Sequence, residues 1–89
     1  MVDPLPEGWS GDARRIRRTY RFASFPAAIA YMVEVAFHCD AANHHPEWKN
    51  VFDRVEVELT THDAGGVTAK DLDLAAHMNA VFARIAGEG

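Results

Sequence analysis

Two segments of the chain alternate apolar with polar residues, which is the pattern of strands that bury one face. They cover residues 15–22 and 55–61. The apolar set of each segment is expected to face a core, and the arginines, glutamates and threonines between them are expected to face solvent. The inward positions are Ile16, Tyr20, Phe22, Val55, Val57 and Leu59.

A third strand is predicted over residues 48–52, immediately before the second alternating segment. An Asp53-Arg54 turn would join the two strands as a hairpin. A short edge segment after Trp9 ends at a Gly11-Asp12 turn. The sequence therefore predicts four strands.

Two other segments repeat apolar residues at helical spacing. The first follows Ser24, a residue suited to an N-cap, has Pro26 in its first turn and is predicted to end near Ala41. The second follows Thr68, which forms a capping-box pattern with Asp71, and extends toward the C-terminus. The expected apolar faces are Ile29, Met32, Val33, Ala36 and Phe37 in the first helix and Leu74, Met78, Val81, Phe82 and Ile85 in the second.

The order strand, strand, helix, strand, strand, helix predicts an α+β fold, a four-stranded antiparallel sheet with both helices packed on one face. With 89 residues the chain has room for one domain. Residues 1–8 contain two prolines and are predicted as an irregular lead-in, and residues 9–89 as the domain.

Composition narrows the possible functions. The net charge of -4 argues against general nucleic-acid binding, and we find neither a signal-peptide pattern nor a bilayer-length apolar segment, so we expect a cytoplasmic protein without nucleic-acid or membrane partners. Five arginines between positions 14 and 21 could meet an anionic partner, but Glu56 and Glu58 offer cross-strand counter-charges, which favours a solvated strand face. Cys39 is the single cysteine and lies in the apolar pattern of the first helix, which indicates a core residue.

Three histidines, His44, His45 and His62, are expected in loops that follow a helix or a strand, since Pro46 disfavours helical backbone at His45. A neutral histidine accepts a proton and a histidinium donates one near neutral pH. A metal site, an acid–base site and incidental surface histidines all remain open on the residues alone. Adjacent side chains tend to diverge and no HExxH spacing is present, which disfavours the metal.

The string from His44 to Phe52, HHPEWKNVF, followed by Thr61-His62, Gly66, Thr68, Asp71 and Ala75, resembles the signature of the pterin-4a-carbinolamine dehydratase family. The resemblance extends from Gly8-Trp9 to Leu74-Ala75. It implies a hydro-lyase (EC 4.2.1.96) that converts a 4a-hydroxytetrahydropterin to quinonoid dihydropterin in tetrahydropterin recycling, without metal or cofactor. It also implies homodimers or homotetramers with sheets paired edge to edge, and a link to an aromatic amino acid hydroxylase.

By the same resemblance, His44, His45 and His62 are the catalytic residues. The resemblance does not divide their roles, and we expect His44 and His62 to form the proton-transfer pair and His45 mainly to position the substrate. Neighbouring positions that the resemblance assigns to the pterin pocket are Asn43, Thr60, Thr61 and Asp63.

Two rival functions remain. The resemblance also implies non-enzymatic members, dimerisation cofactors of transcription factors or assembly factors for a carbon-fixing enzyme, which would not need the three histidines. Pterin chemistry in molybdenum-cofactor metabolism would use the same pocket with another substrate.

Overall fold

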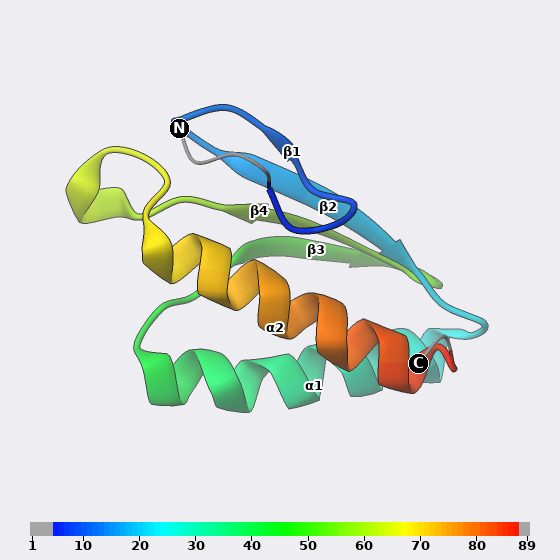
Figure 1. Ribbon diagram of the computed structural model, residues 1–89. Coiled ribbons are helices and arrows are strands. Elements are labelled where there is room, and N and C mark those ends of the chain that lie inside the picture. The colour runs from blue at the N-terminus through cyan, green and yellow to red at the C-terminus, as the bar shows by residue number, and fades with distance from the viewer. Residues whose placement is uncertain (1–4, 88–89) are drawn as a thin grey trace.

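Strands and helices form two separate layers, with the sheet on one side and both long helices on the other (Figure 1). The computed structural model describes residues 5–87. The strands are β1 (Ser10–Gly11), β2 (Ile16–Arg21), β3 (Glu47–Val51) and β4 (Arg54–Leu59), and the helices are α1 (Phe25–Ala42), the short 3-10 helix η1 (His62–Ala64) and α2 (Ala69–Ile85). The order β-β-α-β-β-α and the two layers confirm the predicted fold class.

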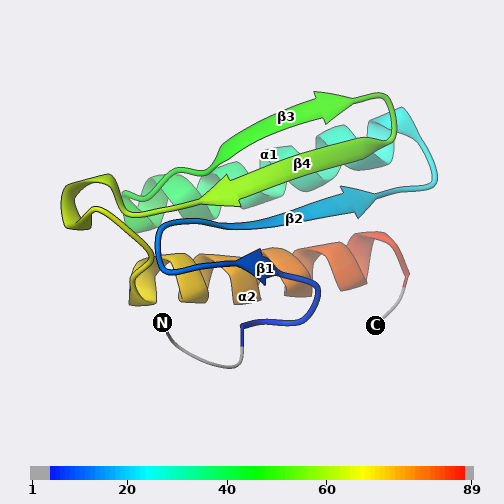
Figure 2. The ribbon, with the colours of Figure 1, turned by 90° about the horizontal axis from the view of Figure 1, so that it is seen from above.

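The sheet is antiparallel throughout, with the strand order β1-β2-β4-β3 (Figure 2). The central pairing joins β2 to β4 from Ile16 opposite Leu59 to Arg21 opposite Arg54. The predicted hairpin forms, but its turn lies at Phe52-Asp53 rather than at Asp53-Arg54. Phe52 takes a positive φ of 51°, and the Asn50 side chain donates to the carbonyls of Phe52 and Arg54, which holds the turn one residue earlier.

The inward positions predicted for the strands are all buried. Tyr20 of β2 and Phe22, directly after β2, contact Tyr31 of α1 and Phe82 of α2, with ring centroids 4.9 to 5.3 Å apart. Burial of each such large apolar side chain contributes about 1.5 to 3 kcal/mol. This aromatic cluster ties both helices to the sheet.

The face of α1 that packs on the core differs from the predicted one. Its buried residues are Ala28, Tyr31, Val35 and Cys39. Ile29, Val33 and Phe37, which the sequence pattern assigned to the core, are exposed. The helix is apolar almost all round, so its hydrophobic period does not distinguish the face that packs on the sheet from the outer face.

Both helices begin at the predicted caps. The Ser24 hydroxyl accepts a hydrogen bond from the Ala27 backbone N–H at 3.2 Å, and Pro26 occupies the first turn of α1. At the start of α2, the Thr68 hydroxyl accepts from the Lys70 N–H, and the Asp71 carboxylate accepts from the Thr68 N–H at 2.9 Å. The predicted capping box is therefore present.

The N-terminal segment is anchored through Trp9. This residue is buried, and its indole N–H donates to the Asn79 side-chain oxygen, which also accepts from Arg18 and the Tyr20 hydroxyl. Residues 5–8 of the predicted lead-in contain no helix or strand, and residues 1–4 lie outside the described residues. In the described part of the chain, no helix combines the length and the apolar character needed to cross a bilayer.

Candidate active site

The sequence segments that carry the three histidines meet at one end of the molecule. Figures 1 and 2 both place there the end of α1, the loop around η1 that follows β4, and the start of α2. The helices run antiparallel, so the last turn of α1 lies beside the first turn of α2. Residues far apart in the sequence therefore contribute to one site.

Asn43 directs the chain out of α1 toward the histidine pair. It caps the helix in the left-handed conformation (φ 53°, ψ 45°), which asparagine adopts more readily than most residues. The His44 N–H still donates to the Cys39 carbonyl at 3.1 Å, and Pro46 follows without a backbone donor. His44 is thereby held close to the helix end, with its side chain 11% exposed.

Asp71 connects the two helices and the η1 loop. One carboxylate oxygen lies 2.6 Å from His44 Nε2, and the other accepts from the Thr61 hydroxyl at 2.7 Å as well as from the Thr68 N–H. The Asp71 side chain is fully buried, where an ionised carboxylate is stable only with several donors around it. The capping box therefore also forms part of the site.

The Asp71 carboxylate determines which nitrogen of the His44 ring carries the proton. Because a carboxylate only accepts hydrogen bonds, Nε2 of His44 must carry the proton that it shares with Asp71. In the neutral ring Nδ1 is then the nitrogen with a free lone pair. A carboxylate that orients an imidazole in this way prepares it to accept a proton at the other nitrogen.

His62 begins η1, directly after Thr61. The loop is closed by the Thr61–Gly66 backbone pair and by the Val67 N–H donating to the Ala13 carbonyl at 2.8 Å. A Cβ on Gly66 would come within 2.5 Å of that carbonyl oxygen, so the close approach requires glycine there. His62 is exposed and lines a hollow of about 480 Å³. The other lining residues are Asp12, Arg14, Arg15, Arg17, Thr60 and Gly65.

Some of the predicted site residues are linked through Asp71 or line the hollow, and the others are exposed near them. His44 and Thr61 are joined through Asp71, and Thr61 is the chain neighbour of His62. Thr60 donates to the Arg14 carbonyl at 2.7 Å and lines the hollow with His62. Three others are exposed at the same end of the molecule: Asn43, His45 and Asp63. Among the described residues no group of three or more His, Cys, Asp or Glu side chains is arranged to hold a metal ion.

Sequence reasoning missed Asp71 as a site residue. Asp71 was identified only as a helix cap and as part of the family signature. Its contact with His44 joins residues 27 positions apart, so local spacing carries no sign of it. The available signal was that a capping-box aspartate begins the helix next to a histidine-bearing loop.

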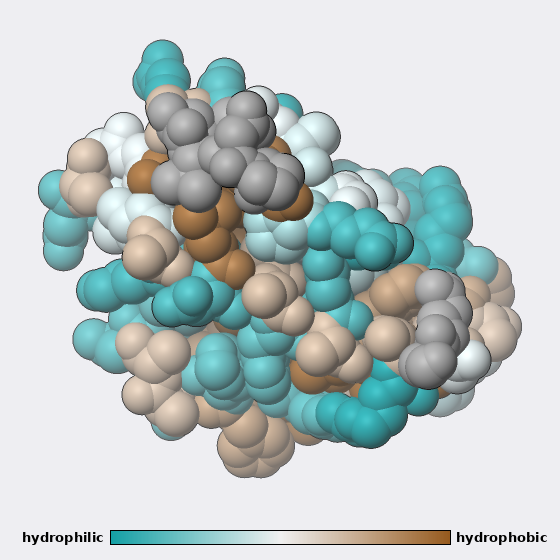
Figure 3. All heavy atoms as spheres, in the orientation of Figure 1, coloured by the Kyte–Doolittle hydropathy of each residue, from teal (hydrophilic) through white to brown (hydrophobic). Residues whose placement is uncertain are grey.

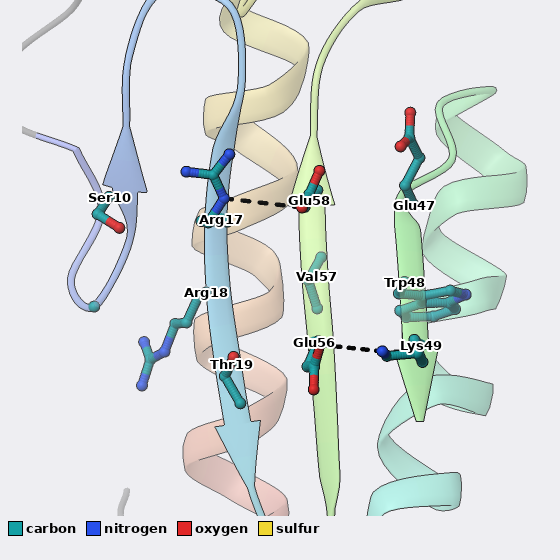
Figure 4. Close-up of a pocket in the computed structure, with 11 residues that line it drawn as sticks. Ser10, Arg17, Arg18, Thr19, Glu47, Trp48, Lys49, Glu56, Val57 and Glu58 are labelled. Atoms are coloured by element: carbon teal, nitrogen blue, oxygen red, sulfur yellow. Dashed lines mark ion pairs between the residues drawn. The ribbon is translucent and has the colours of Figure 1, made fainter. Parts of the chain in front are cut away.

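A second hollow, of about 560 Å³, lies on the strand surface and contains none of the three histidines (Figure 4). Its charges are paired across strands, Arg17 with Glu58 and Lys49 with Glu56 (Figure 4). Arg15 bonds both Glu47 and Glu58 at 2.8 and 2.9 Å. These pairs support the prediction that Arg15 and Arg17 lie on a solvated strand face, whereas Arg18 turns inward and stacks on Tyr20, with its guanidinium carbon 4.4 Å from the ring centroid. The three glutamates that line the hollow are therefore all engaged in ion pairs.

Comparison with known proteins gives a consistent assignment. A family model described as pterin 4 alpha carbinolamine dehydratase matches residues 1–81. A curated relative from Opitutus terrae is 57% identical over 70 residues, which cover 78% of this chain and 72% of the relative. A relative from Rhodopseudomonas palustris is 52% identical over 80 residues, covering 88% and 79%. The names of both relatives refer to the same dehydratase.

Two solved structures share the fold. A transcriptional coactivator/pterin dehydratase from Brucella melitensis has a TM-score of 0.82 at 38% identity, over 84% of this chain and 82% of that one. A pterin dehydratase-like protein identified as a RuBisCO assembly factor in the alpha-carboxysome has a TM-score of 0.69 at 16% identity, over 83% and 86%, and shows likeness of fold alone. On the family match and these identities, the chain belongs to the pterin 4 alpha carbinolamine dehydratase family.

Proposed function

We propose that this protein dehydrates a 4a-hydroxytetrahydropterin to quinonoid dihydropterin by general acid–base catalysis, the reaction of EC 4.2.1.96. In this reaction the C4a–O bond breaks, a C4a=N5 double bond forms, the hydroxyl leaves as water and the N5 proton is removed. Hydroxide is a poor leaving group, so a proton must reach the oxygen as the bond breaks. Two groups that exchange protons are therefore sufficient for the chemistry.

The contact between His44 and buried Asp71 carries the proposal. It leaves His44 Nδ1 as the acceptor in the neutral ring, which suits this nitrogen to take the N5 proton. His62, exposed at the edge of the hollow, would protonate the departing hydroxyl in its histidinium form. After turnover the two histidines exchange protons with solvent and return to their starting forms.

The remaining residues would bind the substrate. His45 is exposed beside His44 and would mainly position the pterin. Groups that could match the polar edge of the ring are Asn43, Thr60, Thr61 and Asp63, because a bound heterocycle needs partners for its polar atoms. The Thr61 hydroxyl already bonds Asp71, so its role would be to hold the site together.

The test is a dehydration assay on the purified full chain. A carbinolamine is generated in situ, and the ultraviolet signal of quinonoid dihydropterin is followed with and without a chelator. We expect acceleration over buffer that the chelator leaves unchanged. A rate equal to buffer would remove the enzymatic assignment and favour a non-enzymatic partner protein, because partner binding does not need a working histidine set.

The same proposal includes a second copy of the chain as partner. Phe25, Ile29, Val33 and Phe37 form an exposed stripe along the outer surface of α1, with Phe37 75% exposed. We name these four residues the α1 stripe. In the orientation of Figure 1, Figure 3 shows apolar side chains interspersed with polar ones along the lower surface, where α1 runs. The spacing of four residues repeats along the helix, so two copies could pack stripe against stripe about a two-fold axis.

Strand β3 offers a further surface for such pairing, because it is the outer strand at one side of the sheet. This edge fits the sheet-to-sheet pairing that the family resemblance implies. The proposal also includes a dimeric or tetrameric state and a cytoplasmic location. The carbinolamine would come from an aromatic amino acid hydroxylase.

A further inference from the structure

His38 of α1 and His77 of α2 stack face to face between the two helices. Their ring centroids are 3.8 Å apart and their planes differ by 14°. Both side chains are half-buried. This pair lies outside the proposed active site, and neither the family signature nor the proposed chemistry uses it.

The pair is in register with the contact that orients His44. His38 precedes His44 by six positions and His77 follows Asp71 by six positions, on helices that run antiparallel. Six helical residues span about 9 Å. The stack therefore lies on the two helices whose neighbouring ends hold His44 and Asp71, with His44 two residues beyond the end of α1, so a change in the spacing of His38 and His77 would act on those ends.

The carboxylate one turn before each histidine, Glu34 before His38 and Asp73 before His77, is either paired elsewhere or exposed. Glu34, one turn before His38, is paired with Arg84 of α2. Asp40 and Asp73 are exposed, and the inner face of the sheet presents apolar residues such as Val57 and Leu59. The Cys39 thiol is buried and its pKa is raised by that burial, so it stays neutral. Burial, and after it the charge of His38, lower the pKa of His77.

We propose that His38 and His77 form a pH-sensitive positioning contact, which holds α1 against α2 while both rings are neutral and separates the helices, and with them His44 and Asp71, when the rings are protonated. Two imidazolium rings about 4 Å apart repel each other. This inference does not depend on the proposed reaction.

The direction follows from linkage. His77 binds its proton less readily in the folded chain than in the unfolded chain, whose histidine has a pKa near ~6.5. The unfolded state therefore binds more protons as the pH falls below ~6.5, and the folded state loses stability there. Above ~6.5 the stabilising contribution of the neutral pair is fully present.

The test compares wild type with His77→Phe, which keeps an aromatic ring for stacking but cannot be protonated. Between pH 7.5 and pH 5.5 the Tm of wild type should fall further than the Tm of His77→Phe, because His77 takes up a proton less readily in the folded chain than in the unfolded chain. Glu34→Gln is the matched control, because it weakens the same seam without removing a histidine. Glu34→Gln should have a lower Tm than wild type at every pH. Its Tm should still fall further between pH 7.5 and pH 5.5 than the Tm of His77→Phe, as in wild type.

Nuclear magnetic resonance of the histidine rings gives the second readout. In wild type, the His44 signals should show an added step at the pH where His77 titrates, and this step should be absent in His77→Phe. His38→Phe provides the same comparison if His77→Phe does not fold. Equal Tm losses in wild type and variant, or no His77-linked step at His44, would overturn the proposal.

Discussion

Asp71 shows how a single buried residue can serve a helix and a site together. Its oxygens accept from His44, Thr61 and the Thr68 N–H, so every donor around it points at a carboxylate. Replacing Asp71 with Asn puts an N–H₂ group where one acceptor was. The Oδ2 position keeps its two donors if the amide nitrogen turns toward His44, and His44 must then accept at Nε2 and carry its proton on Nδ1.

Asp71→Asn should therefore reduce turnover by about 10²-fold, because the base nitrogen of His44 is blocked by its own proton. We also expect a loss of about 1 to 3 kcal/mol in the free energy of unfolding, since buried donors lose a charged acceptor. Steady-state kinetics and thermal unfolding measure the two effects. Asp73→Asn, an exposed change two residues along the same helix, is the control and should alter neither. Full turnover in Asp71→Asn would remove His44 as the base.

His62→Ala should lower turnover more than substrate affinity, since a proton donor acts mainly in the transition state. Loss of a general acid corresponds to about 10²- to 10⁴-fold in rate, or roughly 3 to 5 kcal/mol of transition-state stabilisation. His45→Ala should instead raise KM. Steady-state kinetics on both variants and on the His44, His62 double variant separate these roles. If His62→Ala and the double variant both kept full turnover, the proton-transfer groups would have to be sought elsewhere.

Local sequence could predict the positions of site residues that depend on near neighbours in the chain. It could not predict contacts between residues far apart in the sequence. The loop positions of His44, His45 and His62 follow from Pro46 and from the ends of α1 and β4, which are local signals. The partner of His44 does not, because it depends on how α1 and α2 meet. Their meeting also produces the His38–His77 stack, to which the sequence pattern assigned no role.

At the scale of elements, the sequence predicted where α1 begins and ends but not which of its faces packs on the sheet. Ser24 and Pro26 mark its start, and the left-handed Asn43 marks its end. Apolar residues at helical spacing occur on two sides, and the larger side chains are on the exposed side. Small buried residues such as Ala28 and Cys39 give a weak hydrophobic signal, although they permit close packing. Only the position of the sheet selects the face.

The two helix caps should separate stability from activity. Ser24→Ala and Thr68→Ala each remove a capping hydroxyl, which costs about 0.5 to 2 kcal/mol. The Thr68 hydroxyl also lies 2.6 Å from that of Thr61, which bonds Asp71, whereas Ser24 lies at the other end of α1 from His44. Thermal unfolding should show a lower Tm for both variants, and kinetics a lower turnover for Thr68→Ala alone. An equal loss of turnover in Ser24→Ala would mean that activity follows global stability.

For the whole molecule, element order and alternation were enough to predict the two layers. Alternation defines the faces of a strand and not its neighbour, so the pairing of β2 with β4 in the middle of the sheet was indicated only by the opposite charges on their outward faces. The exposed apolar surface of the folded protein was also not predicted. Ile29, Val33 and Phe37 of the α1 stripe were assigned to the core, and their exposure becomes visible only when Tyr31 and Val35 are seen to fill that core.

The exposed α1 stripe leads to the prediction that the chain self-associates through it. A chain of 89 residues buries a small core, and covering four large apolar side chains with a second copy would add about 1.5 to 3 kcal/mol for each one fully buried. Light scattering at micromolar concentration should give a mass that is a multiple of 9.9 kDa. Phe37→Glu should lose at least half of that mass, because a buried unpaired carboxylate opposes packing at the stripe. Phe52→Glu is the matched control: Phe52 is 67% exposed at the β3–β4 turn and is not part of the stripe, so its replacement should leave the mass unchanged. A wild-type mass of 9.9 kDa, or equal masses for wild type and Phe37→Glu, would contradict association through α1.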